Sequence, residues 1–208
     1  MIALLADTLG WALAFALCVP GLGRSVPRAL GVLATIALAI SVPVAGVSLS
    51  AALRGLFAGV SLVTVVVLAA LFLVRMGGCR LFRDGERLVL AVLAALTGVL
   101  FYPAALGLTS VDPYFWGYGA PVLPLLTGAL AVLAWVTDFR VVALALVVAL
   151  VGWRLQLLAS PNLWDYLIDP LFALGALLAL PALVLSSLKR ARRTPAALRS
   201  AAKSSPAR

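Results

Sequence analysis

The chain has 208 residues, of which 64% are hydrophobic and 11% are charged, and its formal net charge is +9. A soluble domain carries about 25% charged residues, so this chain has too few polar side chains to cover a water-exposed surface. The composition predicts an all-α, polytopic helical membrane protein. The basic residues cluster at the ends of apolar runs, which orientation in a bilayer explains better than DNA binding. The lipid bilayer is therefore an expected partner and nucleic acid is not.

Seven apolar runs follow one another, each near the length of about 20 residues that a helix needs to cross a bilayer. They cover residues 2–20, 29–47, 56–74, 88–107, 119–137, 141–158 and 168–187. Helices are expected because a helix satisfies its own backbone hydrogen bonds in lipid. The connections are short, so neighbouring helices should pack antiparallel. The first run is the weakest because Asp7 interrupts it, and we interpret it as a retained helix because it lacks the basic start of a signal peptide.

Lys and Arg divide unequally between the two sets of alternate connections. One set holds two, four and one of them, and the tail that follows holds seven, which makes fourteen of the 16 basic residues. The other set holds only Arg54, while Arg154 lies within a run. Basic residues stay on the cytoplasmic side, so we expect the N-terminus outside and the C-terminus inside. The predicted location is a cell membrane, namely the inner membrane of a bacterium. Residues 1–187 form the predicted bundle, and residues 188–208 a basic, disordered cytoplasmic tail.

A short aromatic segment occurs twice in the connections that are predicted to lie on the outer side. "DPYFWGYGAP" covers residues 112–121, and the similar "SPNLWDYLIDP" covers residues 160–170. Each lies between two helices that run in the same order, which is the arrangement of a parallel hairpin repeat. Asp112 and Asp169 each precede a Pro, as an N-cap precedes the first residue of a helix. The simplest interpretation is a pair of interfacial aromatic loops, because Trp and Tyr prefer the headgroup level.

A second interpretation is a ligand or pairing cluster beneath these loops. Arg154 lies near the outer end of its helix, against the positive-inside bias, so we expect it to pair with Asp165 or Asp169. The alternative for Arg154 is snorkelling toward headgroup phosphates. The residues that we place in the cluster are Arg154, Gln156, Asp112, Asp165, Asp169, Tyr102, Tyr114, Trp116, Tyr118, Asn162, Trp164 and Tyr166.

The sequence contains no motif for a catalytic site, a metal or a cofactor. It has no His, the usual haem and zinc ligand and the usual acid–base group near neutral pH. Cys18 and Cys79 are interpreted as free thiols without a chemical role. Three classes of function stay open. The first is a non-catalytic, envelope-associated membrane protein or accessory subunit whose outer cluster binds a partner protein, or a lipid-linked or saccharide ligand. The second is a small transporter, and the third is a membrane-embedded transferase that uses outer carboxylates.

Overall fold

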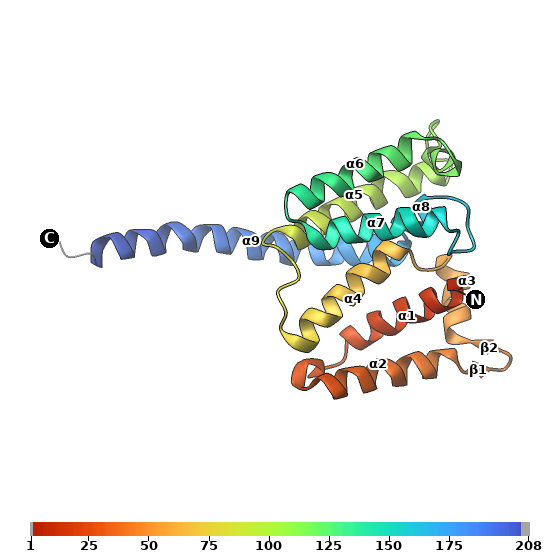
Figure 1. Ribbon diagram of the computed structural model, residues 1–208, viewed down its shortest axis with the longest axis horizontal. Coiled ribbons are helices and arrows are strands. Elements are labelled where there is room, and N and C mark those ends of the chain that lie inside the picture. Colours follow the sequence, from red (N-terminus) through yellow and green to blue (C-terminus); the bar gives the residue numbers. More distant parts are fainter. Residues whose placement is uncertain (1, 205–208) are drawn as a thin grey trace.

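The computed structural model describes residues 2–204, and the side chains of residues 2–190. Within these residues the protein is helical, apart from one hairpin of two very short strands (Figure 1). The elements in chain order are α1 (Ile2–Leu17), η1 (Leu22–Arg24), α2 (Val26–Ser41), β1 (Pro43–Val44), β2 (Val47–Ser48), α3 (Leu49–Phe57), α4 (Leu62–Gly77), α5 (Glu86–Ala105), η2 (Pro113–Tyr118), α6 (Val122–Val136), α7 (Arg140–Arg154), α8 (Trp164–Leu167) and α9 (Pro170–Ser204). Strands β1 and β2 pair antiparallel.

Each predicted apolar run contains a helix, but the third run begins later than its hydropathy indicates. The Ser48 hydroxyl accepts a hydrogen bond from the Ala51 amide and begins a separate helix, α3. That helix ends where Ala58 takes a left-handed φ of 60°. The Ser61 hydroxyl then caps α4 through the Thr64 amide. Local capping therefore forms a separate short helix at residues 49–57, most of which hydropathy assigns to a connection.

Two helices of the described chain are long and apolar enough to cross a bilayer, Glu86–Ala105 and Pro170–Arg190. The other helices that match predicted runs are shorter, with 15 or 16 residues each. At 1.5 Å per residue they are about 23 Å long, against about 30 Å for the hydrocarbon core of a bilayer. The seven helices are therefore present, and their crossing of a membrane stays a prediction.

The last helix, α9, extends to Ser204. It includes most of the segment 188–208, for which the sequence predicts a disordered tail, and residues 205–208 lie outside the described part of the chain.

The helices run side by side between two ends of the molecule (Figure 1). Helix α1 packs between α2 and α4, α4 packs on α7, and α7 packs on α6, while α5 packs along α9. Small residues allow the closest approaches: a Cβ added at Gly98 of α5 would lie 2.7 Å from the Cβ of Ala173 in α9. We call the end with the N-terminus, α3, η2 and α8 the aromatic end. We call the end with η1, residues 78–85 and residues 137–139 the basic end.

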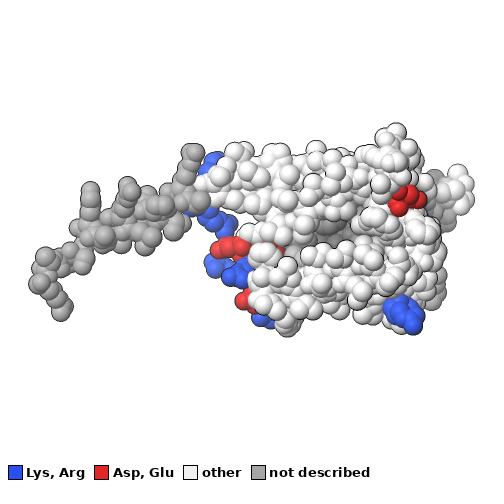
Figure 2. Space-filling model, turned by 90° about the horizontal axis from the view of Figure 1, so that it is seen from above, with Lys and Arg blue, Asp and Glu red and all other residues white. Residues whose placement is uncertain are grey.

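Charge is confined to these two ends. In residues 2–187, each Asp, Glu and Arg lies in a connection or within two turns of a helix end, and α9 carries its first basic residues, Lys189 and Arg190, at the end of its apolar part. Figure 2 shows one face of this pattern, with blue and red atoms at both ends and an uncharged surface between them. The uncharged zone exposes large apolar side chains at the middle of helices, such as Leu96 at 53%, Leu130 at 48% and Leu178 at 74%.

Candidate functional site

The two aromatic loops bind each other at the aromatic end. The Trp164 indole Nε1 donates to the carbonyl oxygen of Pro113 at 2.8 Å, and the Asn162 amide Nδ2 donates to the carbonyl oxygen of Tyr114 at 2.9 Å. The Leu163 backbone amide donates to the carbonyl oxygen of Gly117 at 3.0 Å. Two segments with similar sequences thus form one unit, which we call the loop lock (residues 112–118 and 160–167).

Gly117 is required by this contact. A Cβ added there would lie 1.7 Å from Oδ1 of Asn162. That oxygen accepts the Trp164 amide at 2.9 Å, so the fully buried Asn162 side chain is engaged on both of its polar atoms. Asn162 therefore belongs to the predicted cluster as a structural bridge between the loops.

The two copies of the aromatic pattern have opposite environments. Tyr166 is fully buried, and its hydroxyl donates to Ser160 O at 3.0 Å and accepts from Leu158 N at 3.1 Å. Its counterpart Tyr118 is 54% exposed, and Trp116 is 47% exposed. The second copy thus forms the core of the loop lock, and the first copy forms its outer surface.

Tyr114 and Asp165 connect the loops through their side chains. The Tyr114 hydroxyl donates to Asp165 Oδ2 at 2.9 Å. Burial raises the pKa of the Tyr114 hydroxyl, and its hydrogen bond to the Asp165 carboxylate raises that pKa further. The phenol is therefore held in its neutral, donating form at physiological pH.

Arg154 does not form the expected ion pair. It is the last residue of α7, its side chain is exposed, and none of the ion pairs among the described residues includes it. Asp165 faces Tyr114 and Asp169 faces α4, so neither carboxylate is directed at α7. Gln156, also exposed, donates to the carbonyl oxygen of Trp153 within its own turn. The paired interpretation of Arg154 is wrong for this structure, and snorkelling is the interpretation left.

Asp169 lies at the centre of a different network. It is only 4% exposed. Its Oδ1 accepts the Phe172 amide at 2.8 Å, which caps α9 as the sequence predicts. Its Oδ2 accepts the Ser61 amide at 2.8 Å and the Thr64 hydroxyl, both at the start of α4. One carboxylate therefore binds the positive ends of two helices. Asp112, by contrast, is an exposed cap that accepts the Tyr114 amide of η2.

Asp7 holds the residue next to Ser61. Its Oδ1 accepts the Val60 amide at 2.8 Å, and Arg54 Nη1 lies 3.1 Å from its Oδ2. Oδ2 is buried and receives no aligned hydrogen bond from the described residues. Two successive amides, at Val60 and Ser61, are thus bound by carboxylates from opposite ends of the chain. Asp7 is 3% exposed, and it joins α1 to the connection between α3 and α4.

A cavity of about 190 Å³ lies beside Asp7. Its polar lining includes the side chains of Asp7, Arg54, Ser160 and Asp165. The cavity is therefore large enough for a small polar group, and two carboxylates and one guanidinium line it. We call it the outer pocket. Among the described residues no group of three or more His, Cys, Asp or Glu is placed to hold a metal ion.

Two other buried polar atoms at this end of the bundle are notable. The Tyr102 hydroxyl and the Trp11 indole nitrogen are buried, and neither has a hydrogen-bond partner among the described residues. Tyr102 packs against Phe101, with ring centroids 5.5 Å apart in an edge-on geometry. Tyr102, a predicted cluster residue, is thus part of the apolar packing beneath the loop lock.

The structure brings together part of the predicted cluster. Asn162, Trp164, Tyr166, Tyr114 and Asp165 meet in the loop lock, while Arg154 and Gln156 lie apart from it. Asp7 and Arg54 are in the outer pocket, although the sequence analysis treats them only as a weak point of a helix and a topological exception. The signal was available for Asp7, because an ionisable residue inside an apolar run marks a site by default.

Comparison of the chain with protein-family models, with curated proteins and with solved structures finds no match.

Proposed function

We propose that the protein is a non-catalytic, multi-pass protein of a cell membrane that binds the polar head of a lipid-linked or saccharide ligand in its outer pocket. The membrane location is supported by the uncharged zone between two charged ends. A soluble protein does not expose so wide an apolar surface. Exposed apolar residues in the connections, including Val44 at 76% after α2 and Leu155 at 64% after α7, extend this zone beyond the short helices. Local thinning of the bilayer accommodates the remaining mismatch.

The proposed orientation places the aromatic end outside and the basic end in the cytoplasm. Trp116 and Tyr118 are then at the outer headgroup level, where aromatic residues concentrate. The basic end contains the three Arg-rich connections of the chain. This is the positive-inside arrangement, with α1 starting outside and α9 ending inside.

The hairpin repeat is part of the same proposal. In a repeat of the hairpins α5–η2–α6 and α7–α8–α9, α5 is equivalent to α7, and α6 is equivalent to α9. The helix pair α5–α9 is therefore equivalent to the pair α7–α6. These two pairs are the most extensive helix packings among the described residues. Such pairing supports a parallel repeat. The cavity between these helices, about 470 Å³, is lined almost wholly by apolar side chains. That lining suits an apolar chain better than the passage of a polar substrate.

The observation that carries the binding function is the Asp7–Arg54 ion pair at the wall of the outer pocket, in which the buried Asp7 Oδ2 lies 3.1 Å from Arg54 Nη1 without an aligned hydrogen bond. Two carboxylates accept from hydroxyl or ammonium groups, and Arg54 donates to an acceptor oxygen, so the pocket fits a group that has both. A sugar head fits this description. Pockets for whole drug-sized ligands measure about 300–1,000 Å³, so 190 Å³ holds a head and leaves the rest of the ligand in the apolar zone.

The bonding of the three carboxylates that the sequence offers for catalysis, Asp112, Asp165 and Asp169, favours binding over catalysis. Asp169 is held by three donors and Asp112 caps η2. Asp165 accepts from a Tyr114 hydroxyl that is held neutral. A transferase needs a carboxylate that is free to exchange a proton or to attack a substrate.

Native mass spectrometry of the protein extracted from its own membrane tests the proposal. We expect a bound saccharide-bearing lipid on the wild type. Ala159→Phe, which fills the outer pocket at an exposed lining residue, should abolish binding. Asp165→Asn should reduce occupancy about tenfold, because it removes one charge-assisted hydrogen bond.

Ala52→Phe is the matched control, since Ala52 is an exposed residue of the neighbouring α3 and does not line the pocket. It should bind as the wild type does. The same ligand occupancy on Ala159→Phe and on the wild type would exclude the outer pocket as the binding site.

A further inference from the structure

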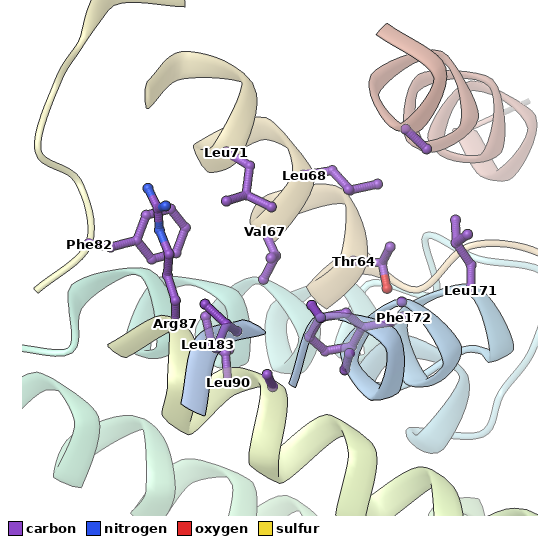
Figure 3. A pocket seen from close by; sticks show the side chains of 15 residues that line it. Thr64, Val67, Leu68, Leu71, Phe82, Arg87, Leu90, Leu171, Phe172 and Leu183 are labelled. Carbon is purple, nitrogen blue, oxygen red and sulfur yellow. The ribbon is translucent and has the colours of Figure 1, made fainter. Parts of the chain in front are cut away.

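An apolar groove opens between the two halves of the bundle, on the opposite side of Asp169 from the outer pocket. Its volume is about 370 Å³, and it is lined by α1 and α4 on one side and by α5 and α9 on the other. Figure 3 shows the labelled side chains of α4 and α9 directed into it, with Thr64 and Leu171 toward one mouth and Arg87 with Phe82 toward the other.

The two mouths of the groove differ in free polar groups. At the aromatic end the Thr64 hydroxyl is already bonded to Asp169 and to the Ser61 hydroxyl at 2.9 Å. At the basic end Arg87 is exposed and lies over the Phe82 ring, with its guanidinium carbon 4.7 Å from the ring centroid. No ion pair among the described residues includes Arg87. The groove therefore offers one available charge, which is positive and at the basic end.

The groove has the dimensions of an acyl chain. Along α9 its lining extends from Leu171 to Leu183, which at 1.5 Å per residue is about 18 Å. One leaflet of a bilayer has a hydrocarbon depth of about 15 Å. The length and the apolar lining of the groove therefore match one unbranched chain.

The surroundings of Arg87 favour a head of net negative charge. The described part of the basic end carries nine basic residues, from Arg24 to Arg190, and three acidic ones, Asp84, Glu86 and Asp138. Its formal charge is therefore +6 from these twelve groups. A cationic surface of this kind attracts anionic lipids, and each nearby Lys or Arg strengthens the attraction.

We propose that the groove binds an anionic glycerophospholipid of the cytoplasmic leaflet, with the phosphate at Arg87 and one acyl chain between α4 and α9. The proposal rests on the membrane location argued above and is independent of the outer pocket. Arg87 binds the phosphate of the headgroup, and the apolar side chains of the groove contact the acyl chain.

The test uses the full-length protein reconstituted in vesicles of equal parts phosphatidylglycerol, which is anionic, and phosphatidylcholine, which is zwitterionic. Native mass spectrometry after gentle extraction reports the retained lipid. We expect phosphatidylglycerol to be retained in preference to phosphatidylcholine. Arg87→Gln should lower this preference about fivefold, because it removes the direct hydrogen bonds to the phosphate. Arg80→Gln removes the same charge from the same connection outside the groove, and should change the preference less than twofold.

A second variant tests the apolar part of the site. A Cβ added at Gly175 of α9 meets nothing within 4 Å, and Gly175 lines the groove. Gly175→Leu should therefore fill the groove without a clash, and it replaces a poor helix former by a good one. We expect it to displace the retained phosphatidylglycerol. Gly31→Leu is the matched control, because Gly31 also meets nothing within 4 Å and lies on α2, away from the groove.

Three results would overturn the proposal. The first is equal retention of the two lipids by the wild type. The second is an equal loss with Arg87→Gln and Arg80→Gln. The third is unchanged phosphatidylglycerol on Gly175→Leu, checked to be folded by its thermal unfolding profile. Failure of the outer-pocket experiment would leave all three measurements unaffected, so the two proposals are tested separately.

Discussion

Asp169 and Glu86 show how single carboxylates hold this protein together. Asp169 binds the beginnings of α4 and α9 at the aromatic end. Glu86 is fully buried near the basic end, where it accepts the amides of Val141 and Val142 at 2.8 and 3.1 Å and the amide of Arg83 at 2.8 Å. Helix starts have unpaired amides and a partial positive charge. Each carboxylate accepts hydrogen bonds from such amides and places a negative charge beside the helix start. Inside an apolar bundle, an unpaired amide would lower the stability of the fold most.

Asp169→Ala should destabilise the fold strongly. It removes the acceptor of two amides and one hydroxyl that are buried with it. An unsatisfied buried donor costs about 1–3 kcal/mol, so the free energy of unfolding should fall by about 3 kcal/mol or more. Chemical unfolding of the purified protein in detergent measures this.

Asp112→Ala is the control for this prediction, because Asp112 also precedes a Pro and caps a helix, but is exposed. Loss of that cap should cost about 1 kcal/mol or less. Equal effects of the two substitutions would show that Asp169 acts as an ordinary cap and that its bonds to α4 contribute little.

At the scale of elements, the local parts of the structure could be predicted and the long-range parts could not. Asp169–Pro170 starts α9 and Asp112–Pro113 starts η2, as capping rules indicate. The Ser61 amide that Asp169 also binds is 108 residues away in the sequence, and no local pattern marks it. The sequence pairs Arg154 with Asp165 or Asp169 because Arg154 lies near the outer end of its helix, against the positive-inside bias. The second loop instead turns against the first loop, and this carries Asp165 toward Tyr114.

From the structure of the loop lock, we expect substitution of Trp164 to destabilise the fold and substitution of Trp116 to leave its stability unchanged. Trp164→Phe removes the indole donor to Pro113 O while keeping an aromatic ring against Phe101, whose centroid is 4.6 Å away. We expect faster hydrogen exchange at the Leu163 amide, which bonds across the lock, and a lower unfolding temperature. Trp116→Phe should change neither, because Trp116 is 47% exposed and its indole forms no hydrogen bond with the described residues. Similar behaviour of both variants would contradict the assignment of the second copy as the core.

At the scale of the whole molecule, the apolar sides and charged ends suit a lipid bilayer better than water. The middle of the bundle exposes Leu and Val on helices that are only partly buried against one another, and water would oppose this arrangement. Lipid removes that cost, and packing then relies on close contacts such as Gly98 against Ala173. The seven apolar helices and their order were predictable from hydropathy, whereas the short helices α3 and α8 were not. Their lengths and pairings were not, because apolar runs of Leu, Ala and Val carry little information about which face meets which neighbour.

The orientation of the bundle gives the last prediction. Cys79 is exposed at the basic end, and Phe115 is 69% exposed on the surface of the loop lock. Cells that carry the Cys18→Ala variant should show no labelling of Cys79 by an impermeant maleimide until the membrane is opened. Cells with Phe115→Cys in a background lacking both native Cys residues should be labelled while intact. The reason is the distribution of Arg and Lys, which in the proposed orientation places the basic end in the cytoplasm. Labelling of Cys79 in intact cells would contradict the proposed orientation. It would show that the basic end lies outside and that the outer pocket lies on the cytoplasmic side.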